Sequence, residues 1–158
     1  MSIEIVPVTT ENAADFGEVI YRSWGETYRG LIPDEVLDGR SPDRWTERAK
    51  NSPEGKFIVY VGDEAAGAMG ILPQAREFCT HGDSGEVVAL YVLKKYRRMG
   101  LGRALLETAI DAVGKSGLTL FVLKGNENAA DFYKHMGFEF TGKVFEEGCF
   151  TELEMYRR

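Results

Sequence analysis

The spacing of apolar residues along this chain switches several times between the two-residue period of strands and the longer period of helices. An alternating strand is predicted at residues 3–8. Three helices follow it, and they are predicted along the stripe Ala13, Phe16, Ile20 and Trp24, around residues 34–37, and over residues 42–50. The chain therefore opens with one strand and a group of helices.

The rest of the chain alternates strands with helices. Strands are predicted at residues 57–61, 65–73, 87–92, 118–123, 138–145 and 150–156, and helices over residues 100–114 and 129–136. The apolar face of the helix at 100–114 carries Leu101, Ala104, Leu105, Thr108, Ala109, Ala112 and Val113. Residues 74–85 are polar and are expected to form a loop. This order of elements predicts an α/β protein.

Composition narrows the class of protein. The 158 residues suit one domain, and 44% hydrophobic with 28% charged residues is typical of a soluble globular protein. No apolar run approaches the ~20 residues of a transmembrane helix, and the N-terminus lacks the features of a signal peptide, so a cytoplasmic protein is expected. Cys79 and Cys149 lack metal-ligand spacing and are expected to be reduced thiols. The net charge of -6 argues against general nucleic-acid binding.

One basic segment runs against this acidic background. Residues 94–103 hold no carboxylate and contain the cations Lys94, Lys95, Arg97, Arg98 and Arg103. Gly100 and Gly102 lie in the same segment, where the strand at 87–92 gives way to a helix. A helix N-terminus offers unpaired N–H groups and partial positive charge, and glycines let a ligand approach the backbone. The junction predicts a phosphate seat, with a glycine-rich turn carrying solvated arginines as the alternative.

The spacing excludes two common phosphate motifs. The P-loop pattern Gly-x-x-x-x-Gly-Lys-Ser/Thr is absent from the chain. A dinucleotide fingerprint needs a third Gly or Ala at the position of Leu105. A mononucleotide-binding α/β module is therefore disfavoured.

A second distinctive segment covers residues 126–138. Its apolar stripe, formed by Ala129, Phe132, Tyr133 and Met136, predicts a short helix. Asn128 suits the N-cap of this helix, and Gly137 suits the left-handed position after its end. On that stripe Tyr133 is either a core aromatic residue or a reactive group.

Both segments resemble motifs of the GNAT superfamily of N-acetyltransferases. The residues that carry the resemblance are Arg97-x-x-Gly100-x-Gly102 for the acetyl-CoA pyrophosphate motif, and Asn126, Tyr133, Gly137 and Phe138 for a later motif. Glu86 precedes both in the order usual for the superfamily. The resemblance spans nearly the whole chain and implies one GNAT domain over residues 1–158. It also implies a mixed α+β sheet of about six to seven strands with flanking helices, splayed between the fourth and fifth strands.

The resemblance implies transfer of the acetyl group of acetyl-CoA to a primary amine by direct attack in a ternary complex, without a metal. The implied cofactor-binding residues are Leu90, Tyr91, Val92, Arg97, Arg98, Met99, Gly100, Leu101, Gly102, Arg103 and Asn126. Glu86 is the implied general base, often acting through water, and Tyr133 the implied general acid for the thiolate. For Glu86 the alternative is a solvated carboxylate at the start of a strand.

The acceptor amine is less defined. The resemblance places Trp24, Tyr28, Glu146 and Glu147 along the acceptor groove, and aromatic and carboxylate groups suit a cationic amine. Trp24 is equally consistent with a core position, and the two glutamates with a solvated turn. Polyamine, antibiotic, amino acid and protein N-terminus stay open, as do acyl groups other than acetyl and a homodimeric state. An acetyl-CoA-binding sensor without turnover is the alternative function.

Overall fold

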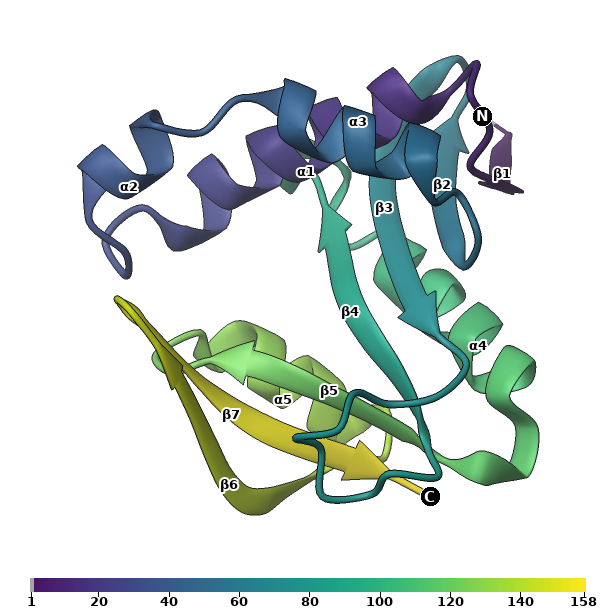
Figure 1. The fold of residues 1–158 in the computed structure, drawn as a ribbon. Helices are drawn as coiled ribbons and strands as arrows, with labels where there is room; N and C mark the ends of the chain where they lie inside the picture. Colours follow the sequence, from purple (N-terminus) through teal and green to yellow (C-terminus); the bar gives the residue numbers. More distant parts are fainter. Residues whose placement is uncertain (1) are drawn as a thin grey trace. The chain divides into compact units, whose positions relative to one another are not determined.

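The computed structural model describes residues 2–158 of the chain (Figure 1). Its strands are β1 (Ile3–Pro7), β2 (Lys56–Val61), β3 (Glu64–Leu72), β4 (Gly85–Val92), β5 (Leu118–Leu123), β6 (Glu139–Glu147) and β7 (Phe150–Arg157). Its helices are α1 (Ala13–Tyr28), α2 (Asp34–Asp38), α3 (Pro42–Asn51), α4 (Leu101–Val113) and α5 (Glu127–His135), with short 3₁₀ turns at Lys94–Tyr96 and Gly114–Ser116.

The strands form one mixed sheet in the order β1-β2-β3-β4-β5-β7-β6. β4 pairs in parallel with β5, over Gly85–Val87 and Leu118–Leu120, whereas β5, β7 and β6 are antiparallel neighbours. The predicted mixed α/β sheet with flanking helices is thereby confirmed. The chain divides into two compact units, and each is described separately below.

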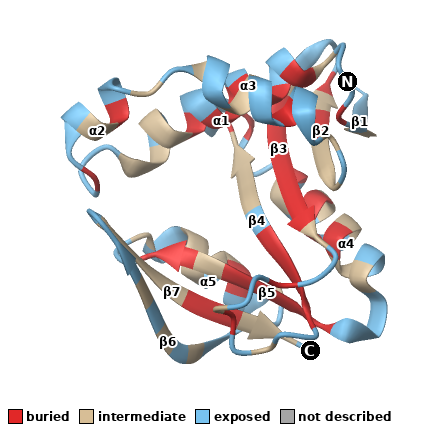
Figure 2. Ribbon diagram, in the orientation of Figure 1, coloured by how far each residue is buried: buried red, intermediate tan, exposed pale blue. Residues whose placement is uncertain are grey.

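The first unit comprises the residues up to Gly70 and Ala89–Glu107. Here β1 and β2 pair antiparallel, and β2 pairs with β3 through Lys56–Val61. β3 is buried over most of its length (Figure 2), which agrees with its run of small and apolar residues. Gly17 of α1 lies so close to α3 that an added Cβ would stand 2.8 Å from the Pro42 carbonyl oxygen. The absence of a side chain at Gly17 therefore sets the approach of these two helices.

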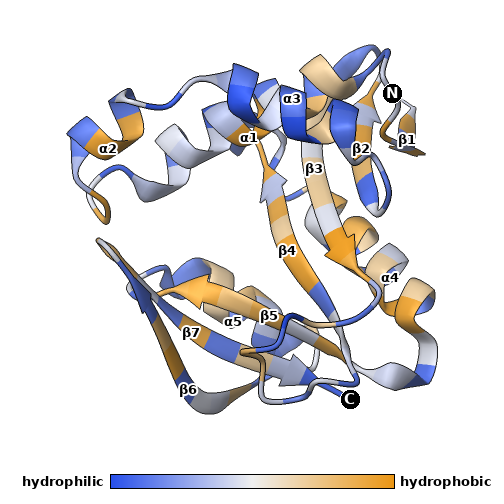
Figure 3. Cartoon of the chain, viewed as in Figure 1, coloured by the Kyte–Doolittle hydropathy of each residue, from blue (hydrophilic) through white to orange (hydrophobic). Residues whose placement is uncertain are grey.

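The second unit comprises Ile71–Val88 and Thr108–Arg158. Its central strand β5 is strongly hydrophobic (Figure 3), as expected of a strand covered on both faces. The end of α5 is tied to β7, because Nε of Arg157 donates to the Met136 carbonyl at 2.9 Å. α5 begins at Glu127 with Asn126 at the N-cap, so the predicted cap at Asn128 is wrong. The Asn126 N–H bonds the Leu123 carbonyl, and this turn directly after β5 starts the helix two residues earlier.

Two glycines of α1 give a matched test of the packing between α1 and α3. Gly17→Ala should destabilise the protein by about 1–3 kcal/mol, because the new methyl group overlaps Thr46 and the Pro42 carbonyl. Gly25→Ala should instead stabilise by up to about 1 kcal/mol, because no atom lies within 4 Å of its added Cβ. Urea unfolding of the two variants measures the difference, and equal stabilities would contradict the packing described.

Candidate functional site

The predicted phosphate seat lies in the first unit, at the start of α4. Arg98 and Gly100 both adopt left-handed backbone conformations, with φ of 68° and 78°. The Ala104 N–H bonds the Gly100 carbonyl at 3.0 Å and begins the helical ladder. The N–H groups of the preceding first turn point beyond the helix, and left-handed residues before them form the kind of concave backbone that binds anions. An added Cβ at Gly100 would meet no atom within 4 Å, so the backbone is open to a ligand there.

The cations around this seat do not all remain available to a ligand. Lys95 pairs with Glu64 at 2.9 Å, and Arg103 pairs with Glu107 at 2.7 Å. Such exposed pairs contribute at most about 1 kcal/mol each to stability, so a phosphate could compete with them. The sequence pattern did not indicate these pairs, because Glu64 lies far back in the chain and Glu107 lies one helical turn beyond the basic segment.

Arg97 is directed toward the last turn of α1. Its Nη2 donates to Oγ1 of Thr27 at 3.2 Å, and its Nε donates to the Val92 carbonyl at 3.4 Å. The Glu26 carboxylate accepts the Lys94 N–H at 3.0 Å. The end of α1 thus supports the segment that leads from β4 into the phosphate seat.

The predicted cofactor strand and two predicted acceptor residues come together in the same unit. Leu90, Tyr91 and Val92 are half-buried at the end of β4. The Tyr28 and Tyr91 hydroxyls lie 3.0 Å apart, and either one donates. Trp24 packs edge-on against Tyr28, with ring centroids 5.2 Å apart. The structure therefore groups Trp24, Tyr28 and Tyr91 into one aromatic cluster.

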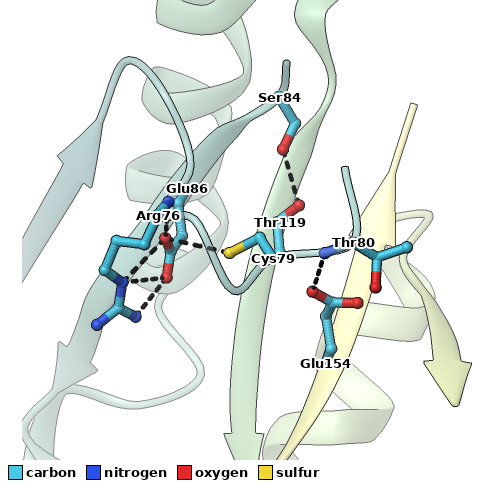
Figure 4. Close-up of polar contacts among 7 residues, drawn as sticks. All are labelled: Arg76, Cys79, Thr80, Ser84, Glu86, Thr119 and Glu154. Atoms are coloured by element: carbon cyan, nitrogen blue, oxygen red, sulfur yellow. Dashed lines mark hydrogen bonds and ion pairs between the residues drawn. The ribbon is translucent and has the colours of Figure 1, made fainter. Parts of the chain in front are cut away.

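Glu86, the predicted general base, lies in the second unit and is completely buried. The alternative of a solvated carboxylate is therefore wrong. Figure 4 shows the contacts of Glu86 with Arg76 and Cys79. One carboxylate oxygen accepts the Arg76 backbone N–H at 3.0 Å and the Cys79 thiol at 3.4 Å. The Arg76 guanidinium donates to both oxygens, through Nε and Nη2. The Glu86 hydrogen bond raises the pKa of Arg76, and burial raises the pKa of the Cys79 thiol to about 12, so that sulfur stays protonated.

Arg76 and Cys79 belong to residues 73–84, here named the strap, which joins β3 to β4. The Thr80 N–H donates to the Glu154 carboxylate at 2.9 Å, and the Ser84 and Thr119 hydroxyls lie 2.8 Å apart (Figure 4). The His81 ring stacks on Tyr156 with centroids 3.6 Å apart. The strap therefore lies across one face of β5 and β7. From the sequence, only a polar loop is predicted here, because residues 74–85 lack a hydrophobic period.

The remaining predicted site residues also lie in the second unit. Tyr133 is buried, with its ring 5.8 Å from that of Phe138 and edge-on to it. This burial agrees with a core position and leaves its role as general acid a prediction. Asn126 is half-buried at the start of α5, whereas Glu146 and Glu147 are exposed at the end of β6.

Within residues 2–158 no group of three or more His, Cys, Asp or Glu side chains is arranged to hold a metal ion. No helix in the described part of the chain is long and apolar enough to cross a membrane.

The fold is that of an α/β protein whose strand-to-helix junction before α4 has the left-handed backbone typical of anion sites. The chain belongs to the acetyltransferase (GNAT) family, which it matches over residues 18–138. It is 30% identical over 126 residues to the uncharacterized N-acetyltransferase YuaI of Bacillus subtilis, covering 73% of this chain and 69% of that one.

Two matches in Thermoplasma acidophilum, one in sequence and one in structure, extend the comparison. The chain is 27% identical over 147 residues to a spermidine N(1)-acetyltransferase, covering 88% of this chain and 89% of the relative. Its fold matches the crystal structure of a PaiA N-acetyltransferase in complex with coenzyme A, with a TM-score of 0.78 and 21% identity over 98% of both chains. The protein is thus an acetyltransferase-family enzyme with the GNAT fold.

Glu154 gives a pH-dependent test of the strap. Burial alone would raise the pKa of Glu154, but hydrogen bonds from Thr141 and Thr80 outweigh it and lower the pKa. A lowered pKa in the folded state stabilises the protein above the unfolded pKa, and this contribution is lost as the pH falls. Glu154→Gln should therefore lower the free energy of unfolding by about 1–3 kcal/mol at neutral pH, and by less at about pH 4.

Unfolding free energies of wild type and Glu154→Gln at the two pH values measure this difference. Glu139→Gln, an exposed position on the neighbouring strand β6, is the matched control. A cost for Glu154→Gln that is the same at both pH values would contradict the role given to these hydrogen bonds.

Proposed function

We propose that this enzyme transfers the acetyl group of acetyl-CoA to the primary amine of a small cationic molecule, by direct attack in a ternary complex. The observation that carries the proposal is the anion seat with left-handed Arg98 and Gly100 before α4. Membership of the acetyltransferase family supports acyl transfer as the reaction. The relative named for spermidine supports a cationic acceptor, and the coenzyme A complex of the PaiA protein supports the cofactor.

The seat fits a diphosphate, because open backbone and unpaired N–H groups meet there. The amides of residues 98–103 would hold the pyrophosphate, the backbone of residues 90–92 would pair with the pantetheine arm, and Asn126 would contact that arm. Acetyl-CoA supplies an activated acyl thioester when bound. The Val92 N–H is the proposed donor to the thioester oxygen, and one preorganised donor of this kind is worth about 2.7–4 kcal/mol in a transition state.

The reaction also requires two proton transfers, one from the acceptor ammonium and one to the departing thiolate. The acceptor reaches the site as an ammonium ion, because alkylamines have a pKa of about 10, and it must lose a proton before it attacks. Glu86 is the candidate for this step from the sequence, directly or through water. Tyr133 is the candidate that protonates the departing thiolate, a contribution of about 10²–10⁴ in rate for a general acid.

An acetyl-CoA-binding sensor without turnover is the second candidate function. The observation that favours it is the full engagement of the Glu86 carboxylate by Arg76 and Cys79. A panel of alkylamines with acetyl-CoA, followed by release of free CoA thiol, separates the two functions. We expect release above the rate without amine; binding of acetyl-CoA with no release on any amine would establish the sensor.

The cofactor assignment predicts a selective thermal shift. Acetyl-CoA at about 100 times its Kd should raise the Tm by roughly 5–10 °C, whereas ATP and NAD should not. Gly102→Glu should abolish the shift, because it adds bulk and negative charge at the pyrophosphate seat. Gly82→Glu adds the same charge at an open loop position and should keep the shift. An unchanged shift in Gly102→Glu would place the cofactor elsewhere.

The general-acid assignment predicts a selective loss of turnover. Tyr133→Phe keeps the buried ring but deletes the hydroxyl, so kcat should fall by roughly 10- to 1000-fold. The acetyl-CoA thermal shift should persist, because residues 98–103 are unchanged. Tyr21→Phe, at a more exposed tyrosine of α1, should leave kcat as in wild type. If kcat of Tyr133→Phe also equals that of wild type, another group or water protonates the thiolate.

A further inference from the structure

The hydrogen bonds of Glu86 leave little capacity for a substrate. A carboxylate accepts about four hydrogen bonds. The two oxygens of Glu86 already meet the Arg76 N–H, two guanidinium nitrogens and the Cys79 thiol, and the side chain is 0% exposed. In this arrangement neither an ammonium group nor a bridging water has an oxygen of Glu86 to bind.

A second carboxylate lies on the same face of the sheet. Glu86 pairs with Thr119 of β5, and Thr119 pairs with Tyr156 of β7. Paired residues share a face, and side chains alternate along a strand, so Glu154 and Glu152 follow Tyr156 on that face. Glu154 is fully buried and bonded to Thr80 and Thr141, whereas Glu152 is half-buried. Within residues 2–158 the Glu152 carboxylate accepts no hydrogen bond.

An aromatic residue is the cross-strand neighbour of Glu152, and a second aromatic ring stacks on it. Glu152 pairs across the strands with Phe145 of β6. Phe145 stacks on Phe78 of the strap at 4.6 Å, and the Arg76 guanidinium lies 4.6 Å from the centre of the Phe78 ring. Such a platform of aromatic faces accepts cations, as its contact with Arg76 illustrates.

The charges that face Glu152 come from three elements. Arg76 on the strap is the single cation among them, and Glu86 on β4 and Glu147 on β6 are anions. Burial raises the pKa of Glu152, and the two glutamates add to this, against the opposing effect of Arg76. A carboxyl group with a raised pKa is a better proton acceptor than an ordinary surface glutamate.

We propose that Glu152 binds the ammonium group of the acceptor and takes its proton before acyl transfer, while the Arg76–Glu86 pair holds the strap in place. This proposal rests on the proposed function and assigns its substrate class, an alkylammonium compound. Glu86 is then a positioning residue, and Glu152 is the catalytic residue that touches the substrate.

The proposed step balances in protons and electrons. An N–H bond of the ammonium breaks, and its proton passes to the Glu152 carboxylate. The freed nitrogen lone pair forms the C–N bond of the amide as the acyl C–S bond breaks, and the electrons of the C–S bond leave on the thiolate. A second N–H bond of the attacking nitrogen then breaks, and its proton passes to solvent, which leaves the neutral amide. The thiolate takes a proton from solvent or from Tyr133, which solvent then reprotonates. Glu152 returns its proton to solvent, so that one proton is released in all.

The test compares two kinds of amine, because only one of them must lose a proton before it attacks. An alkylamine is almost wholly protonated at neutral pH, whereas an arylamine is neutral. Glu152→Gln should lower kcat/KM for an alkylamine by about 100-fold or more, and for an arylamine by less than about 5-fold. The deficit with the alkylamine should shrink as the pH approaches about 10, where free amine becomes abundant.

Three further variants complete the design. Glu152→Asp keeps a shortened carboxylate and should recover part of the alkylamine rate, which guards against a folding defect in Glu152→Gln. Glu86→Gln should lower both rates by a similar factor, together with the Tm. Glu139→Gln, exposed on β6, should match wild type with both amines.

The outcomes separate this proposal from the proposed function. An alkylamine rate in Glu152→Gln equal to that of wild type would overturn the assignment, as would an equal loss with both amines. A selective loss of the alkylamine rate in Glu86→Gln would show that Glu86 is the general base, and this result would also overturn the assignment of Glu152. Wild-type protein that acetylates neither amine would overturn the proposed function, and the Glu152 assignment with it.

Discussion

The buried carboxylate of Glu86 is the constraint on which the second unit depends. Removing a carboxylate from water costs several kcal/mol unless a counter-ion and hydrogen bonds replace the lost hydration. The strap provides both, through the Arg76 guanidinium and backbone N–H and the Cys79 thiol. The same segment satisfies the second fully buried carboxylate, Glu154, through the Thr80 N–H. A polar segment without helix or strand is therefore held in one conformation by two buried charges.

The conformation of the strap depends on these contacts and could not be predicted from the sequence, whereas the helices and strands could. Strands and helices leave a periodic pattern in the sequence, and their positions were predicted to within a few residues. The strap has no period, and its contacts join residues far apart in the chain, such as Thr80 and Glu154, 74 positions apart. On α4 the pattern also missed Leu106, which is fully buried, and placed Ala112 inside although it is exposed. The spacing of apolar residues along one helix does not show which residues from other elements pack against that helix in the fold.

The backbone geometry of the proposed phosphate seat was predictable for the opposite reason. Its physical requirements, a helix N-terminus, left-handed backbone and a basic background, all lie within ten consecutive residues. Even here the structure added a partner that spacing does not reveal. Arg97 turns to Thr27 and the Val92 carbonyl, so the residue that best matched a family motif contacts the protein's own chain.

The face that carries Glu86, Glu154 and Glu152 places three identical side chains in different surroundings. Glu86 and Glu154 are fully buried and hydrogen-bonded, an arrangement that stabilises the fold, and at Glu86 the donors leave no lone pair for chemistry. Glu152 is half-buried beside aromatic rings, and burial raises its pKa. The charge of such a carboxylate is poorly solvated, so the carboxylate contributes less to the stability of the fold. For the same reason, a bound cation stabilises this charge more than it would stabilise a well-solvated carboxylate. In the assignment that we propose, the reactive carboxylate is therefore the half-buried one without a hydrogen bond, and the carboxylate at the motif position, Glu86, is structural.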